Sequence, residues 1–182
     1  AQRDTFLQGA ARQGVDSALA TEIFNLMAHF ADYGFNKSHS AAYALVTYQT
    51  AYLKANYPQE FMAALLTSVM GTNDKISYYI EECRRMGLAV LPPDINASSA
   101  GFTVDGESIR FGLAGVKNVG ENAIGNITQA RQEGGRFVSL VDFCSRVDMR
   151  VVNKRVIESL IKCGAFDSLG WKRSQYIAVL EQ

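Results

Sequence analysis

The 182-residue sequence has few cysteines and prolines and no excess of either charge. Its three cysteines, Cys83, Cys144 and Cys163, are odd in number and far from any Cys-x-x-Cys spacing. This pattern argues against a disulfide scaffold and against a cysteine-ligated zinc site. Lys and Arg together number 18, as do Asp and Glu, which excludes a uniformly basic nucleic-acid binder but not a local basic patch.

The signals of a membrane protein and of a metal-dependent catalyst are also missing. No apolar run is long enough to span a bilayer and no secretory leader is recognised, so we expect a cytoplasmic protein without a membrane partner. Asp4, Asp32, Asp94 and Asp105 are isolated, and no pair has the spacing of two metal ligands. Because metal-assisted phosphoryl transfer needs clustered carboxylates, we expect no metal site, cofactor or catalytic residue here. The chain opens on Ala1 with a helical pattern under way, which suggests a segment of a larger protein.

What is present suffices for a folded core. The chain is 48% hydrophobic and 20% charged, and its length permits one or two small domains. The main electrostatic asymmetry lies in residues 143–176, where seven basic residues stand against three acidic ones. The basic residues of this window are Arg146, Arg150, Lys154, Arg155, Lys162, Lys172 and Arg173.

Apolar spacing predicts a mainly α fold for the first half of the chain. Asp16 is placed to cap a helix whose apolar face runs from Leu19 to Phe30, and a second helix is predicted from Ser38 to Asn56. Its expected buried stripe consists of Ala41, Ala42, Leu45, Tyr48, Tyr52 and Leu53. Further helices are expected over residues 59–69 and from residue 74 to Gly87.

The spacing of apolar residues stops being helical after Gly87 and becomes helical again after residue 112. Residues 88–91 have the pattern of a strand, and Asp105-Gly106 is typical of a β-hairpin turn. Later helices are expected over residues 121–132, 139–147, 153–163 and 171–180. The predicted organisation is therefore a helical segment (1–87), a short β element (88–112) and a second helical domain (113–182).

The run Tyr-Gly-Phe-Asn-Lys-Ser-His-Ser-Ala-Ala-Tyr at residues 33–43 turns a polar loop into an apolar helix. Unpaired backbone N–H groups at a helix start are electropositive and attract anions. Lys37 adds a mobile positive charge, and Asn36, Ser38 and His39 add hydrogen-bonding groups. The set suits a phosphate group, although Ser38 equally fits an ordinary N-cap that binds nothing.

Two glycine-containing joints between helices are candidates for binding a DNA backbone. The first, at residues 113–124, passes through Lys117, Asn118, Val119 and Gly120 into a helix. It resembles the second half of a helix-hairpin-helix motif, whose turn directs backbone N–H groups at a phosphate. Asn118 stands where that motif usually has its first glycine, and because Asn tolerates the left-handed conformation, the turn can survive.

The second joint, at residues 160–170, contains Lys162 and Gly164 and lies inside the basic window. It departs further from the motif, because it has no Gly-x-Gly, and helical hairpins with glycine are mostly structural. Two joints in tandem with a net positive charge nevertheless favour duplex binding. No helix carries Arg, Asn and Gln at base-reaching spacing, so we expect phosphate contacts without sequence readout.

Several segments resemble a known family, the C-family replicative DNA polymerases of bacteria, which are the alpha subunits of DNA polymerase III. The resemblance covers nearly the whole chain from Asp16 onward. It is carried by residues 33–43, 48–62, 83–87, 91–96, 109–113, 153–158 and 164–170.

This resemblance implies the end of a fingers domain followed by a tandem helix-hairpin-helix domain. In the family, the fingers close over the incoming nucleoside triphosphate and the templating base. The residues that would face the nucleotide or template are Asn36, Lys37, Ser38 and His39. The tandem domain grips double-stranded primer-template DNA. The residues that would approach its backbone are Lys117, Asn118, Val119, Gly120, Lys154, Arg155, Lys162 and Gly164.

The family's catalytic palm, with three metal-binding aspartates, has no counterpart in this sequence. Mg²⁺ is expected in that absent palm, so the resemblance implies a nucleotidyltransferase segment that is inactive alone. The rest of the polymerase chain and replisome subunits are the implied protein partners.

Two other interpretations stay open at this point. One is a standalone helix-hairpin-helix scaffold with no polymerase role, although such a module has no reason to carry residues 35–58. The other is a purely structural piece whose glycine turns bind nothing, which the neutral net charge permits.

Overall fold

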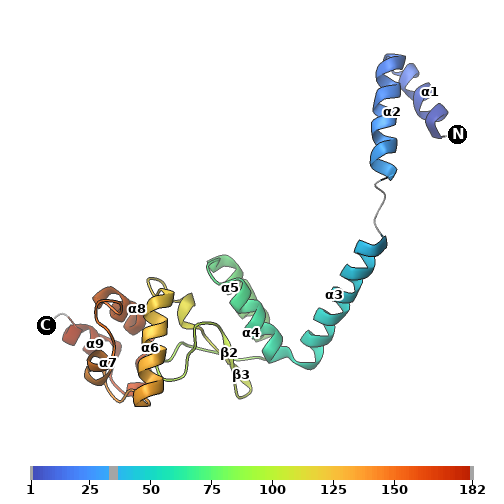
Figure 1. Ribbon diagram of the computed structural model, residues 1–182. Coiled ribbons are helices and arrows are strands. Elements are labelled where there is room, and N and C mark those ends of the chain that lie inside the picture. The colour runs from blue at the N-terminus through green and yellow to red at the C-terminus, as the bar shows by residue number, and fades with distance from the viewer. Residues whose placement is uncertain (1, 33–36, 181–182) are drawn as a thin grey trace. The chain divides into compact units, whose positions relative to one another are not determined.

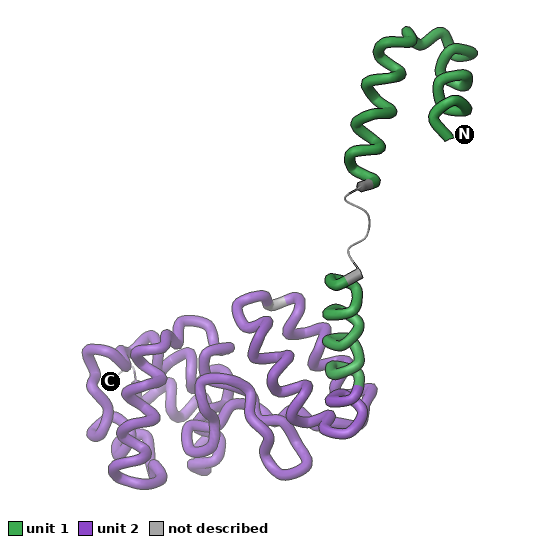
Figure 2. The backbone as a smooth tube through the Cα atoms, turned by 45° about the vertical axis from the view of Figure 1, so that its right-hand side comes forward, with its two compact units in different colours: residues 1–51 green, residues 52–182 purple. Residues whose placement is uncertain are grey.

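The computed structural model describes residues 2–32 and 37–180 (Figure 1). The chain divides into two compact units, residues 1–51 and 52–182 (Figure 2). The division falls inside helix α3 (Lys37–Asn56), which therefore contributes to both units.

The first unit contains a helical hairpin of α1 (Gln2–Arg12) and α2 (Ser17–Asp32). The rings of Phe6 and Phe24 lie 5.5 Å apart and join the two helices. The predicted N-cap is confirmed, because Asp16 Oδ1 accepts hydrogen bonds from the N–H groups of Ala18 (2.9 Å) and Leu19 (3.1 Å).

The apolar faces of α2 and α3 are largely exposed. Phe30 on α2 is 80% exposed and Tyr48 on α3 is 67% exposed. The prediction that the α3 stripe is buried is wrong, since Leu45, Tyr52 and Leu53 are exposed as well. Helical spacing identifies the apolar face of a helix, but it does not show whether that face is buried.

In the second unit, the end of α3 is followed by α4 (Pro58–Ser68) and α5 (Asn73–Arg85), which pack against a three-stranded sheet. The sheet consists of β1 (Val90–Leu91), β2 (Thr103–Asp105) and β3 (Ser108–Arg110) in the order β1-β3-β2. β1 is parallel to β3, and β2 is antiparallel to it.

The predicted hairpin is confirmed, with Gly106-Glu107 as the two connecting residues between the paired Asp105 and Ser108. Gly106 has φ +62°, a conformation that the first central residue of a primed hairpin turn requires.

The chain then returns to helices, as predicted. A short 3₁₀ turn, η1 (Leu113–Gly115), precedes α6 (Glu121–Gly134), α7 (Leu140–Arg146) and α8 (Lys154–Cys163). A second 3₁₀ turn, η2 (Asp167–Leu169), leads to α9 (Arg173–Leu180). Ser139 and Asn153 cap α7 and α8 through side-chain oxygens that accept from the N–H groups of Asp142 and Val156.

Two apolar clusters stabilise this unit. The smaller one joins α4, α5 and the sheet through residues such as Met62, Leu66 and Ile109. The larger one joins α6 to α9, where the Phe143 ring lies 5.0 Å from those of both Phe137 and Phe166. Phe111 packs against both clusters. The fold is therefore mainly α with a small sheet, as predicted, while the three-part functional division at residues 87 and 112 stays a prediction.

Candidate nucleic-acid interface

A groove of about 700 Å³ lies between the loop after η1 and one face of α8. Its polar lining comes from the first joint (residues 113–124), from helix α8, and from Lys162 of the second joint (residues 160–170). These residues are Lys117, Asn118, Arg155, Glu158, Ser159 and Lys162. The structure thus brings together side chains that are about 40 residues apart in the sequence.

Helix α8 can present this face because it is amphipathic. Val156, Ile157, Leu160 and Ile161 are buried in the larger cluster. The intervening positions 155, 158, 159 and 162 follow an i, i+3, i+4, i+7 spacing and so lie on the opposite face. Burial of the apolar face therefore fixes the basic face toward the groove.

Asn118 holds the loop in place. Its φ is +68°, and it is the one non-glycine residue with a positive φ in the described part of the chain. Asn118 Nδ2 donates to Ser159 Oγ over 3.1 Å, and Ser159 Oγ donates to the Arg155 carbonyl over 2.9 Å. The prediction that Asn supports the left-handed turn in place of glycine is confirmed.

Gly120 ends the loop as the N-cap of α6. It makes no side-chain cap, and a Cβ built on it would meet no atom within 4 Å. Val119 beside it is buried, whereas Lys117 and Gly120 are exposed. The first N–H groups of α6 are therefore accessible to an anion, and a second hollow of about 570 Å³ lies along residues 114–120.

The groove carries more positive than negative charge. Lys154 and Arg155 are exposed and form no salt bridge with any described residue. Lys162 Nζ lies 2.5 Å from Glu158 Oε1 in an i, i+4 pair. The hydrogen bond and positive charge of Lys162 hold the pKa of the Glu158 carboxyl below its usual range, with smaller contributions from Lys154 and Arg155.

Other arginines of the basic window have intramolecular roles. Arg146 Nη2 donates to the carbonyls of Ala130 (2.6 Å) and Gly135 (2.7 Å) at the end of α6, and its guanidinium lies 4.4 Å from the Phe137 ring centroid. Arg150 pairs with Asp148 over 2.7 Å. The count of seven basic residues therefore overstates how many cations of the window are free to bind an anion.

Gly164 does not line the groove, although the adjacent Lys162 and Cys163 do. It is the left-handed C-cap of α8 with φ +90°, and its N–H donates to the carbonyl of Ile161 over 3.0 Å. Arg173, which pairs with Asp167, covers it closely enough that a Cβ would overlap the guanidinium. This geometry assigns Gly164 a helix-ending role, and its phosphate contact stays a prediction.

The predicted nucleotide-facing residues lie in the first unit. Asn36 is outside the described residues, and Lys37 begins α3. Ser38 and His39 are exposed in the first turn of α3, and the His39 ring lies 4.4 Å from that of Tyr43. Their role toward nucleotide or template stays a prediction.

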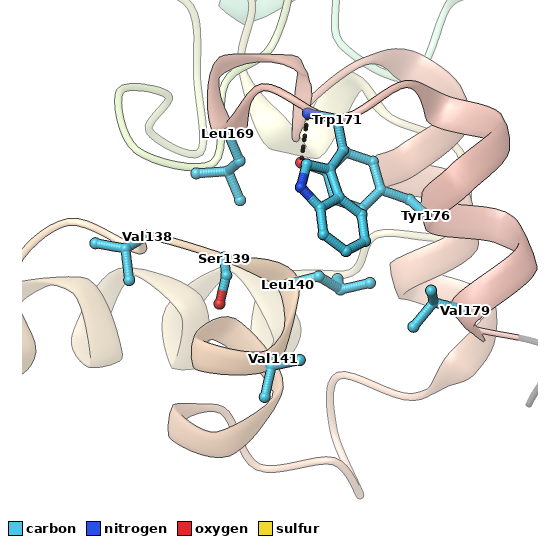
Figure 3. A pocket seen from close by; sticks show the side chains of 8 residues that line it. All are labelled: Val138, Ser139, Leu140, Val141, Leu169, Trp171, Tyr176 and Val179. Carbon is cyan, nitrogen blue, oxygen red and sulfur yellow. Dashed lines mark hydrogen bonds between the residues drawn. The ribbon is translucent and has the colours of Figure 1, made fainter.

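A separate hollow of about 130 Å³ lies between α7 and α9 (Figure 3). It is lined by apolar side chains and Ser139, with the Trp171 ring stacked on Tyr176 at 5.8 Å. No Lys or Arg lines it, so it does not suit a phosphate group.

Across residues 2–32 and 37–180, no group of three or more His, Cys, Asp or Glu side chains could hold a metal ion. No helix in these ranges is both long and apolar enough to cross a membrane.

Among the polar residues that line the groove, the sequence did not predict Glu158 and Ser159. The available signal was their spacing on α8, one turn from Lys162 and Arg155 respectively. The contact of Ser159 with Asn118 joins positions 41 residues apart, and no local pattern indicates it.

Comparison with known proteins adds two findings. The family model described as a helix-hairpin-helix motif matches residues 87–176. DNA polymerase III subunit alpha of Deinococcus radiodurans is 52% identical over 180 residues, covering 99% of this chain and 13% of that protein. The subunit of the same name from Vibrio cholerae is 52% identical over 99% of this chain, and that from Thermus aquaticus is 51% identical over 98%. These two matches cover 16% and 15% of the respective relatives, so the chain spans about a seventh of their length.

Proposed function

Because the chain is a relative of one segment of bacterial DNA polymerase III subunit alpha, we propose that it holds the backbone of duplex primer-template DNA during replication. The observation that carries this proposal is the groove in which Lys117 and Asn118 meet Arg155 and Lys162. A phosphate is recognised by cationic side chains and by backbone N–H groups at a helix start, and this surface offers both.

The exposed geometry favours contact with the DNA backbone over base reading. Arg155 and Lys162 line the groove from α8, with Lys117 on the loop after η1. Lys154 is exposed at the start of α8, and Gly120, the N-cap of α6, lines the adjoining hollow. Cations and backbone N–H groups carry no sequence information by themselves. We therefore expect binding that is indifferent to sequence.

The test is duplex binding by the chain, measured by fluorescence anisotropy over a salt series with two unrelated DNA sequences. The logarithm of the binding constant should fall linearly with the logarithm of salt, with a slope of about −0.9 per phosphate contact and roughly −2 to −4 in total. Lys154→Ala and Arg155→Ala should weaken binding equally for both sequences. Arg84→Ala removes the same charge from the far end of α5 and serves as the control.

The outcomes separate the interpretations. A loss confined to one DNA sequence would contradict backbone binding. Absence of binding even at low salt would overturn the proposal and favour the purely structural interpretation. Equal effects of Arg84→Ala and Arg155→Ala would show that net charge, and not the groove, governs binding.

We further propose that residues 36–39 face the incoming nucleoside triphosphate or the template, as the end of a fingers domain. The support is the family relationship together with the exposure of Ser38 and His39 at the start of α3. Replacing the residues that match Lys37 and His39 in the Thermus aquaticus relative should raise its KM for nucleotide. An unchanged KM would refute this assignment.

The chain by itself should extend no primer. Phosphoryl transfer needs metal ions to stabilise the attacking and leaving oxygens, and the palm aspartates that would bind Mg²⁺ have no counterpart in the sequence. Primer extension above buffer background, with primer-template, nucleotides and Mg²⁺, would disprove this.

A further inference from the structure

The groove contains one carboxylate among its cations, that of Glu158. Its Oε1 lies 2.5 Å from Lys162 Nζ, and in the described part of the chain this is its one hydrogen-bond partner. Asn153, not Glu158, caps α8, and the buried face of the helix is made by other residues. Glu158 is therefore not needed to form or end the helix that carries it.

The carboxylate lies at a position where nearby cations attract an anion. Lys154, Arg155 and Lys162 all lower the pKa of Glu158, which means that the fields of all three cations reach its oxygens. A carboxylate and a phosphodiester are both oxygen anions that accept from the same charged donors. The position suitable for a phosphate is thus occupied by a side chain of the protein itself.

The pair is also easily separated. The side chains of Lys162 and Glu158 are 67% and 43% exposed, and exposed ion pairs contribute little to stability. Lys is a flexible point charge that can turn from one oxygen anion to another. A DNA phosphate can replace the Glu158 carboxylate as the ion-pair partner of Lys162 while the Glu158 side chain turns to solvent.

We propose that the Glu158 carboxylate occupies the position of a DNA backbone phosphate in the groove, and that duplex DNA must displace it from Lys162 in order to bind. This inference rests on the proposed function, because it concerns how the same groove binds DNA. Under this inference, Glu158 lowers the affinity of the groove for the DNA backbone. The negative charge of the displaced carboxylate stays near the DNA and offsets part of the phosphate neutralisation that Lys162 provides.

The test compares the chain with its Glu158→Gln variant by fluorescence anisotropy with duplex DNA over a salt series. Glutamine keeps the size of the side chain and removes its charge. Binding should tighten by roughly 3- to 10-fold at low salt, as expected for removing one like charge close to a phosphate. The salt slope should steepen by about 0.9, the value for one additional net phosphate contact.

Glu133→Gln is the matched control. It makes the same chemical change in an exposed glutamate near the end of α6, about 18 Å along that helix from its first residue, and should alter affinity less than twofold. Thermal unfolding of each variant, followed by circular dichroism, verifies that both remain folded.

Each outcome decides a different point. Tighter binding and a steeper slope for Glu158→Gln alone support the inference. If the original chain binds duplex DNA and Glu158→Gln binds equally or more weakly, the carboxylate positions Lys162 instead, and the inference is overturned while the proposed function stands. If no variant binds, the proposed function fails together with the inference.

Discussion

Arg146 tests whether a basic residue of the 143–176 window stabilises the fold instead of serving as a cation of the groove. The sequence counts it as part of the basic window, yet its side chain is only 19% exposed and its guanidinium donates to two carbonyls at the end of α6. We expect Arg146→Ala to cost stability and to leave the groove's own cations unchanged.

The magnitude follows from the contacts. Bonds from a charged donor contribute about 1.5–3 kcal/mol each, and the lower value applies because water can reach the freed carbonyls. The two short bonds to Ala130 and Gly135 then give about 3 kcal/mol, to which the contact with the Phe137 ring adds about 0.5 kcal/mol. The pair with Asp142 adds little. For a unit of this size, the loss corresponds to a fall in Tm of roughly 10 °C.

The assay is urea denaturation followed by the fluorescence of Trp171, the single tryptophan of the chain, which stacks on Tyr176 in the second unit. Arg150→Ala is the matched control, because Arg150 also pairs with an aspartate but is 89% exposed, and it should cost under about 0.5 kcal/mol. Arg146→Lys keeps the charge without the planar fork and should fall between the two. A loss below about 1 kcal/mol for Arg146→Ala, or one equal to that of Arg150→Ala, would refute this reasoning.

Three further predictions concern other parts of the second unit. In Gly112→Ala the new Cβ would overlap the carbonyl carbon of Gly101, so we expect a loss of about 2–3 kcal/mol in the same denaturation assay, and a loss under about 1 kcal/mol would contradict the close approach. Hydrogen bonds from Arg150 lower the pKa of Asp148 from 3.8 to about 2, so this carboxylate stabilises the fold above pH 4 and ceases to do so as the pH falls to 2. The difference in urea midpoint between the original chain and Asp148→Asn should shrink over that interval, and a difference independent of pH would argue against the pairing. Burial raises the pKa of all three cysteine thiols, but Cys83 is fully buried whereas Cys144 and Cys163 are partly exposed, so iodoacetamide should label Cys83 more slowly than the other two in the folded chain and equally fast in urea, as measured by mass spectrometry.

Local rules account for much of the observed architecture. Asp16 is the N-cap that the sequence predicted, and Ser139 and Asn153, which open two of the expected helices, cap them. The change from helical to alternating period marks the sheet, and the Asp105-Gly106 pair marks its hairpin. These features depend on residues within a few positions of each other, which is why the sequence reveals them.

Burial and the use of charge were less predictable. The stripe on α3 has helical spacing, but spacing does not say whether the covering surface belongs to the same chain. Arg155 and Arg146 look alike in a charge count, although one faces the groove and the other caps α6. The bond between Asn118 and Ser159 depends on how α8 packs against the 115–120 loop, which is decided by the apolar core.

The contact that Phe111 makes with both apolar clusters has a consequence for the lifetimes of different parts of the second unit. Where two apolar cores share few side chains, the smaller core can open while the larger stays closed. The amide protons of the two regions then exchange with solvent through opening reactions of different free energy. We expect the amides of α4 and α5 to exchange before those of α6 and α8. The face of α8 that is proposed to hold the DNA backbone would thus outlast transient opening of the α4–α5 hairpin beside the sheet.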